Sequence, residues 1–459
     1  MKKKIAVLVV TLLVTGVTIV HAQSSEIIVQ GNSLTEKLDW LNAFAQSNGT
    51  YIIEINTDER VTSQNITYSG KNNITITLKG NNGNRTIRLS SRYERLTVGS
   101  GITLILDNNI TLQGVGSHPN TSSTGGVVYV VSNGRLIMNK GASIIHDTSY
   151  DNGHYSSYPD GHGVYLDGGS FTMNDGLITG KRGYGVFLRD GIFIMNDGTI
   201  SSNSFGGVAS QFGNGTFTMT GGSITGNWGG VSMGAGTFTM SGGSISGNKK
   251  HSNNSNYGGG VYVSNSKSSF IMSGGEIKGN TTDFGGGVSV SNGGNFTING
   301  GEISGNTAHS DGGGVHGYFT MNNGIISGNT ARRNGGGVYI NGTFNMSGGI
   351  ISGNTAREYG GGVYVYMVVD SWTGRLSGGI FIKTGGTITG FSNDPNNGNA
   401  IKENSGTARN FRGHSAYAGL SDNVLKIKET TAGPEDSMSF GEQVDRFSYS
   451  PTFSGAWDN

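Results

Sequence analysis

The sequence predicts an all-β chain folded as a parallel β-helix, a solenoid with three short strands in each coil and a capping helix at its N-terminal end. A unit with the pattern GGxVYV, TFTM, SGG and xISGN recurs about every 25 residues, and a fixed period of this size is typical of solenoids. Each unit holds three runs in which apolar and small polar residues alternate, as at Phe238, Thr239 and Met240. This period of two is the period of a β-strand. Gly, Asn or Ser ends each run, and these residues favour tight turns.

Composition excludes several other classes of protein. The chain has 459 residues, of which 82 are Gly and none is Cys. Glycine without a strict period of three excludes collagen, and the regular apolar runs argue against disorder. Charged residues make up 13% and the formal net charge is +1, so neither a nucleic-acid-binding surface nor a polybasic membrane patch is expected. The absence of Cys removes disulfides, iron–sulfur ligation and cysteine catalysis.

Residues 1–22 are predicted to be a cleavable signal peptide. Three lysines precede an apolar run, and the small residues Val20 and Ala22 fit the cleavage site of signal peptidase. A membrane anchor is the alternative, although the run is short for a membrane span. We therefore expect an exported chain that is extracellular, on the cell surface or periplasmic, with no transmembrane segment once the signal peptide is removed.

A single amphipathic helix is expected in residues 23–50, which form the N-terminal cap. Ser33 and Glu36 have the spacing of a capping box, and Leu34, Leu38 and Leu41 fall on one face. An uncapped solenoid would expose its apolar interior, so the helix is expected to cover the first coil. The β-helix is predicted over residues 51–428, in roughly 13 to 15 coils about 65 Å long at the usual strand spacing, with regular repeats at about 125–390. Residues 429–459 are expected to be a C-terminal cap or a flexible tail.

The Asn that closes each xISGN unit is expected to stand at one corner of every coil. Stacked amides at such a corner would bond to one another and to the turn backbone, so the role predicted for this asparagine ladder is structural. Its members are Asn203, Asn227, Asn248, Asn280, Asn306, Asn329 and Asn354.

The alternation of GG motifs with IxxN, as in Gly222 to Asn227 and Gly243 to Asn248, resembles the GGAI and FxxN repeats of polymorphic outer-membrane proteins of the chlamydial type. It is equally similar to the repeat-bearing exported proteins of spirochaetes and gut bacteria. The resemblance covers about residues 125–390. It implies a right-handed parallel β-helix displayed outside the cell, often as an adhesin or antigen, and it does not indicate an enzymatic activity.

Two groups of residues are candidates for a ligand-binding or catalytic site. The first is the insertion between residues 146 and 162, whose His and Asp side chains could ligate a metal or serve acid and base roles, with Asp147, Asp151, Asp160 and His154 as the candidates. Its alternative is a plain exposed loop, because no spacing matches a recognised metal motif. The second group is a set of tyrosines in this loop and at outward positions of the first strand of each coil. These side chains could stack on a glycan or contact a protein, or they could simply stabilise the sheet. They are Tyr150, Tyr155, Tyr158, Tyr165, Tyr339 and Tyr364.

An enzyme must also be considered, because parallel β-helices include pectate lyases and polygalacturonases. Those families gather carboxylates on one sheet, and the lyases bind Ca²⁺. The outward positions of the first strand carry no acid, and the acids Glu276 and Glu302, which do occupy equivalent positions, are expected to form a solvated edge with Lys278. No catalytic residue, metal or cofactor is therefore predicted, and Ca²⁺ is expected only if the chain is a lyase.

The sequence thus favours a monomeric, non-catalytic display protein, an adhesin or antigen that binds a host or matrix glycan or protein through its variable turns. Two alternatives stay open. One is a polysaccharide lyase or glycoside hydrolase of the pectate-lyase type, and the other is a structural component of the cell envelope.

Overall fold

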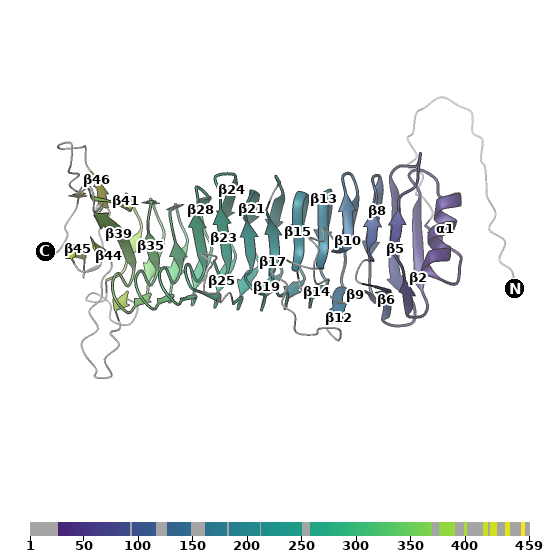
Figure 1. Cartoon of the computed structure of the whole chain (residues 1–459), viewed down its shortest axis with the longest axis horizontal. Helices are drawn as coiled ribbons and strands as arrows, with labels where there is room; N and C mark the ends of the chain where they lie inside the picture. The colour runs from purple at the N-terminus through teal and green to yellow at the C-terminus, as the bar shows by residue number, and fades with distance from the viewer. Residues whose placement is uncertain are drawn as a thin grey trace, which may run out of the picture.

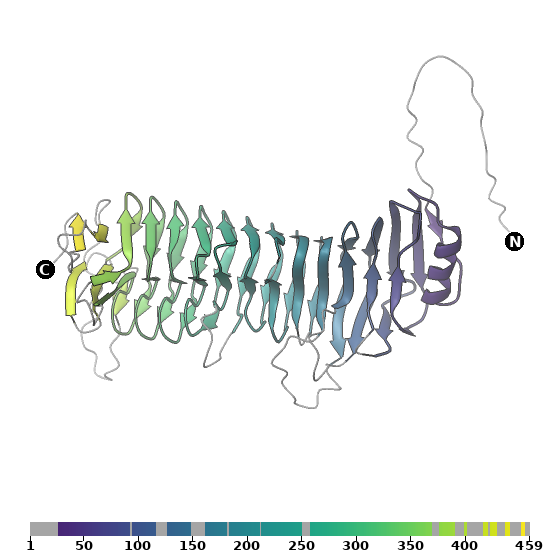
Figure 2. The same ribbon diagram turned by 45° about the horizontal axis from the view of Figure 1, so that its top comes forward.

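The chain is a parallel β-helix, as the repeats predict, and its coils stack into one straight rod (Figures 1 and 2). The computed structural model describes residues 26–91, 94–115, 126–147, 161–180, 183–211, 213–249, 258–369, 376–390 and 399–401, and four further strands up to residue 454. Strands at equivalent positions of successive coils pair in parallel, so each face of the rod is a sheet running along its axis.

Three strand positions recur in each coil. The first comprises β4 (Gln64–Ile66), β7 (Leu96–Val98), β10 (Gly126–Val131), β13 (His162–Met173), β15 (Tyr184–Met195), β17 (Gly206–Ser210), β20 (Val231–Met233), β23 (Val261–Ser264), β27 (Val288–Ser291), β31 (Val315–His316), β35 (Val338–Ile340), β39 (Val363–Val369) and β44 (Ala416–Leu420). β13 and β15 continue without a break into the second position. The remaining members of the second position are β1 (Ile27–Ile28), β2 (Thr50–Ile55), β5 (Ile74–Gly80), β8 (Ile102–Leu106), β11 (Arg135–Met138), β18 (Thr216–Met219), β21 (Gly236–Met240), β24 (Ser268–Met272), β28 (Asn295–Ile298), β32 (Phe319–Met321), β36 (Thr343–Met346) and β41 (Ile380–Lys383).

The third position forms a 13-stranded sheet of its own. Its members are β3 (Glu59–Val61), β6 (Arg85–Leu89), β9 (Ile110–Val115), β12 (Ala142–Asp147), β14 (Leu177–Thr179), β16 (Thr199–Ser201), β19 (Ser223–Thr225), β22 (Ser244–Ser246), β25 (Glu276–Lys278), β29 (Glu302–Ser304), β33 (Ile325–Ser327), β37 (Ile350–Ser352) and β42 (Thr387–Ile388). Later coils add a fourth, two-residue strand that the repeat pattern did not predict. These strands are β26 (Thr281–Thr282), β30 (Thr307–Ala308), β34 (Thr330–Ala331), β38 (Thr355–Ala356) and β43 (Ala400–Ile401).

The interior is built from identical side chains stacked coil upon coil. Phe217, Phe238 and Phe270 lie with ring centroids 4.6 Å apart and nearly parallel, and each is fully buried. Met219 and Met240 stack beside them in the same register. Because every coil presents the same residue at the equivalent position, columns of one type of side chain fill the interior along the rod. The opening coils, which lack the sequence repeat, keep the same register in β5 and β8.

Glycine in the SGG turn is required by this stacking. Gly243 has φ +78°, a left-handed conformation that favours glycine. A Cβ at this position would also lie 2.6 Å from the Cε atom of Met219 in the preceding coil. The turn between the second and third strands thus lets the methionine of one coil pack beneath the glycine of the next.

Both ends of the rod are covered (Figure 1). At the N-terminal end, α1 (Leu34–Phe44) begins at Ser33, whose Oγ accepts a hydrogen bond from the backbone N of Glu36 at 3.2 Å. Leu34, Leu38 and Leu41 are buried on one face, so the predicted capping helix is confirmed. Lys37 is buried as well, and its Nζ donates to the carbonyl of Glu54 at 2.5 Å, an anchor that the helical pattern did not predict.

The far end is closed by antiparallel strands. β40 (Leu376–Gly378) pairs with β39, β45 (Asn423–Lys428) turns back against β44, β46 (Ser437–Phe440) pairs with β41, and β47 (Pro451–Ser454) pairs with β46. β45 lies within the range predicted for the β-helix, but it folds back on β44 and does not begin another coil.

Candidate functional site

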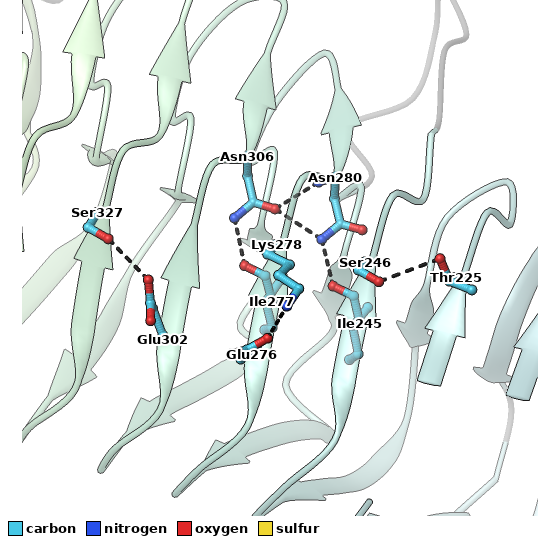
Figure 3. Close-up of polar contacts among 10 residues, drawn as sticks. All are labelled: Thr225, Ile245, Ser246, Glu276, Ile277, Lys278, Asn280, Glu302, Asn306 and Ser327. Atoms are coloured by element: carbon cyan, nitrogen blue, oxygen red, sulfur yellow. Dashed lines mark hydrogen bonds and ion pairs between the residues drawn. The ribbon is translucent and has the colours of Figure 1, made fainter. Parts of the chain in front are cut away.

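The asparagines that close the xISGN units form a continuous buried ladder. The amide Oδ1 of Asn306 accepts hydrogen bonds from the backbone N of Asn280 at 2.9 Å and from its Nδ2 at 3.0 Å (Figure 3). The same Nδ2 of Asn280 donates to the carbonyl of Ile245 at 2.9 Å. This pattern repeats along the rod and gives the asparagines a structural role. The linked residues are Asn203, Asn227, Asn248, Asn280, Asn306, Asn329, Asn354 and, beyond the expected set, Asn399.

A second polar ladder follows the second strand and was not predicted. Asn174 lies between Asn139 and Asn196, with amide–amide distances of 3.0 Å on both sides, and these side chains are largely exposed. The sequence signal was the polar residue that follows Met in each unit. Because this ladder faces solvent, its hydrogen bonds compete with water and contribute less to stability than those of the buried one.

The outward positions of the first strand align in one row, with Tyr165 between Tyr129 and Phe187. Pointing outward does not leave these side chains exposed, however. Tyr165 and Tyr364 are only 4% and 2% exposed, and Tyr339 is half-buried. The structure therefore does not present the free contact strip that these tyrosines suggested.

Residues at the start of a first strand, or in the loop just before it, cover parts of this row. His162 stacks on Phe187 with a centroid distance of 4.8 Å, and Tyr359 stacks on Tyr364 at 6.4 Å. Glycine allows the close approach, since a Cβ at Gly360 would lie 2.7 Å from that of Tyr364. The aromatic side chains thus form two packed outer clusters, and between them the row carries Ala209, Ser232, Tyr262 and Ser289. One cluster comprises Tyr129, His162, Tyr165, Tyr184, Phe187 and Phe205, and the other Phe284, His316, Tyr339, Tyr359, Tyr364 and Tyr366.

A charged network borders the first cluster and was also missed. The Arg95 guanidinium lies 4.4 Å from the centroid of the Tyr129 ring, the Tyr129 hydroxyl donates to Asp167, and Asp167 lies 3.4 Å from Arg189. Burial and the bond to Asp167 raise the pKa of Tyr129 to about 12, so its hydroxyl stays protonated and keeps donating. No sequence motif joins these residues, because four successive coils contribute them.

Most of the insertion between residues 146 and 162 lies outside the described residues, including Tyr150, Asp151, His154, Tyr155, Tyr158 and Asp160. Asp147 is the last residue of β12. His162, at the other boundary, is 2% exposed, and burial lowers its pKa to about 3. Its Nδ1 accepts a hydrogen bond from the backbone N of Tyr184 at 3.1 Å. His162 is therefore a neutral packing residue of the first cluster.

Glu276 and Glu302 are partners in neighbouring strands of the third sheet. Lys278 bonds to Glu276 on its own strand, whereas Glu302 accepts a hydrogen bond from Ser327 at 3.3 Å (Figure 3). The two acids thus turn to different partners along an exposed edge and do not gather around a common point.

A recess opens where the two outer clusters are separated. Only Trp228, Gly229 and Gly230 separate Asn227 from Val231, whereas eight residues, including β30, separate Asn306 from Val315. This coil therefore lacks the fourth side of the later coils. Trp228 stands in the recess with 43% of its surface exposed and borders a hollow on each side. One hollow is lined by Tyr184, Phe205, Ser232 and Tyr262, among others, and the other includes Ser202, Ser204 and Lys249.

Comparison with known proteins adds no family to this description: no protein-family model matches the chain, and no curated protein or solved structure does either. Within the described ranges, no three His, Asp or Glu side chains gather in a group that could hold a metal ion. The part of the chain that the structure describes also contains no helix with the length and hydrophobicity needed to cross a membrane.

Proposed function

We propose that this chain is an exported, non-catalytic display protein, a rigid rod that binds a glycan or protein partner through side chains on its outer face. The exposed side chain of Trp228 and the exposed serine hydroxyls beside it carry this proposal. The stacked phenylalanines and the buried asparagine ladder support it, because they make the rod stiff and hold surface side chains at fixed spacings.

The described carboxylates of this face support a binding role over a catalytic one. Asp167 bonds to Tyr129 and Arg189, Asp190 accepts from the backbone N of Asn214 at 2.9 Å, and Asp311 accepts from the backbone and side chain of Asn334, both at 3.0 Å. Each of these acids is occupied in holding the fold together. A general acid or base needs a carboxylate that is free to meet the substrate.

A polysaccharide lyase or glycoside hydrolase is the second candidate, and one observation favours it. Asp167 and Arg189 place an acid beside an arginine, 3.4 Å apart, on the outer face of the first sheet. If the chain is a lyase, Ca²⁺ would be required, and Asp147, Asp151 and Asp160 of the 146–162 insertion would complete the catalytic site. A structural role in the cell envelope differs from display only in lacking a specific ligand.

The test is a panel of polysaccharides incubated with the purified full chain, with and without Ca²⁺, and assayed for both retention and cleavage. Retention without cleavage is expected. Cleavage that disappears in the Asp167→Asn variant, or in an Asp147→Ala, Asp151→Ala, Asp160→Ala triple variant, would replace the display proposal with the enzymatic one. Export is tested separately, since a secreted product should begin at Gln23.

A further inference from the structure

Trp228 is placed by backbone contacts and is not held in by packing. Its backbone N donates to the carbonyl of Asn203 at 3.0 Å, and the N of the following Gly229 donates to the carbonyl of Asn227 at 2.9 Å. Both carbonyls belong to buried residues of the asparagine ladder. A large aromatic side chain thus extends from the corner that carries the asparagine ladder, and 43% of its surface stays exposed.

The surroundings of Trp228 are aromatic on one side and hydroxylic on the other. Tyr184 and Phe205 lie edge to face at 6.0 Å and form one wall, and Tyr262 is at the opposite wall. Ser232 lies between these walls, paired with Ala209 in the preceding coil and with Tyr262 in the following one. On the other side of Trp228, Ser202 and Ser204 are exposed beside Lys249, which among the described residues is the one charged side chain that lines either hollow.

We propose that this recess binds a neutral oligosaccharide, with the apolar face of one sugar ring stacked on the Trp228 indole and neighbouring hydroxyls bonded to the serines. This inference rests on the proposed binding function and names its ligand class. Sugar rings combine an apolar face with a rim of hydroxyls, which is the combination that a tryptophan flanked by serines can satisfy. The described lining of the recess contains a single charged side chain, which offers little to a strongly charged ligand.

Size also favours a glycan over a protein. The recess extends from Tyr184 in β15 to Tyr262 in β23, three coil steps or about 14 Å at the usual strand spacing. A stable protein interface needs about 800 Å² on each partner, which is far larger than such a patch.

The experiment is calorimetric titration of the full chain with cellohexaose, xylohexaose, maltohexaose and chitohexaose. At least one should bind, and Trp228→Ala should weaken that binding by about tenfold or more, as expected for a central aromatic contact. Trp228→Phe should retain part of the affinity, because a smaller ring can still stack. Phe44→Ala removes an aromatic side chain that is 60% exposed on α1 and should leave binding unchanged. Unaltered circular dichroism of each variant shows that the rod is intact.

The outcomes separate this inference from the proposed function. Binding that is insensitive to Trp228→Ala would overturn the recess while leaving a display role in place. If none of the four hexasaccharides binds, the proposal of an oligosaccharide site in the recess is wrong as well. Retention of the chain on another polysaccharide or a protein would still support display. Cleavage of a hexasaccharide would overturn the display function itself.

Discussion

Replacing Asn280 by Ala tests the claim that the buried ladder holds the coils together. The Asn280 side chain is fully buried and makes four hydrogen bonds of 2.9–3.0 Å: its Oδ1 accepts two from Asn248, and its Nδ2 donates to Ile245 and to Asn306. At about 1 kcal/mol for each bond, Asn280→Ala should lower the free energy of unfolding by about 4 kcal/mol. Water cannot easily replace these bonds, because the vacated site is enclosed by the neighbouring coils.

The assay must allow for the repeat architecture, because coils can unfold locally. Hydrogen exchange of the backbone amides of β22, β25 and β29, measured together with urea unfolding, reports the loss at the altered corner. Asn322→Ala is the matched control, since the exposed Asn322 also bridges two coils, donating to Asn299 at 2.8 Å and accepting from Ser347 at 3.0 Å. The control should cost no more than about 1 kcal/mol. If both variants lose the same stability, the ladder is not the element that ties the coils together.

Three further changes test the packing of the rod. Gly243→Ala should lower the free energy of unfolding in urea by about 3 kcal/mol, because it adds a clash with Met219 to the strain of a non-glycine residue in the left-handed conformation. Gly247 is also at positive φ, but a Cβ there would meet no atom nearer than 3.7 Å, so Gly247→Ala should cost only about 1 to 2 kcal/mol. Equal costs of the two substitutions would contradict the packing argument. Phe238→Ala should cost about 3 to 5 kcal/mol by opening a cavity in the ring stack, while Phe238→Leu should cost clearly less, and a cost near zero would show that the stack is dispensable. Burial lowers the pKa of His162 from its ordinary 6.5 to about 3. The contribution of the neutral imidazole to folding stability is therefore complete above pH 6.5 and declines toward pH 3, by up to about 1.4 kcal/mol per pH unit. His162→Phe should flatten this part of the stability–pH curve, and an unchanged slope would refute the assignment.

The first-strand row shows where alternation stops being informative. Period two correctly puts Val164 inside and Tyr165 outside, and the register pairs Tyr165 with Phe187. Whether an outward ring is exposed to solvent depends on the residues that precede it, at the start of the strand or in the loop before it. His162 and Tyr184, the first residues of β13 and β15, pack over these rings. The repeat pattern does not predict this contact.

The recess at Trp228 was overlooked for a related reason. Its signal was present as a short spacing, since Val231 follows Asn227 after only three residues. A shortened loop indicates a missing side of the coil only once the fourth strands of the later coils, such as β30, are known. The network of Arg95, Tyr129 and Asp167 likewise joins residues far apart in the chain, which only the stacking of coils brings together.

By itself the sequence determined the coil: which residues alternate, where turns fall, and which Phe, Met, Ile and Asn recur at a fixed interval. Those properties are local, and in a solenoid each coil contacts mainly its neighbours, so local pattern and global fold coincide. The tertiary structure alone decided which outward side chains are covered, how α1 and the antiparallel strands close the ends, and where the rod is recessed around Trp228. These features arise between the loops of different coils, whose lengths vary outside the repeat, and burial there is a property of several segments at once.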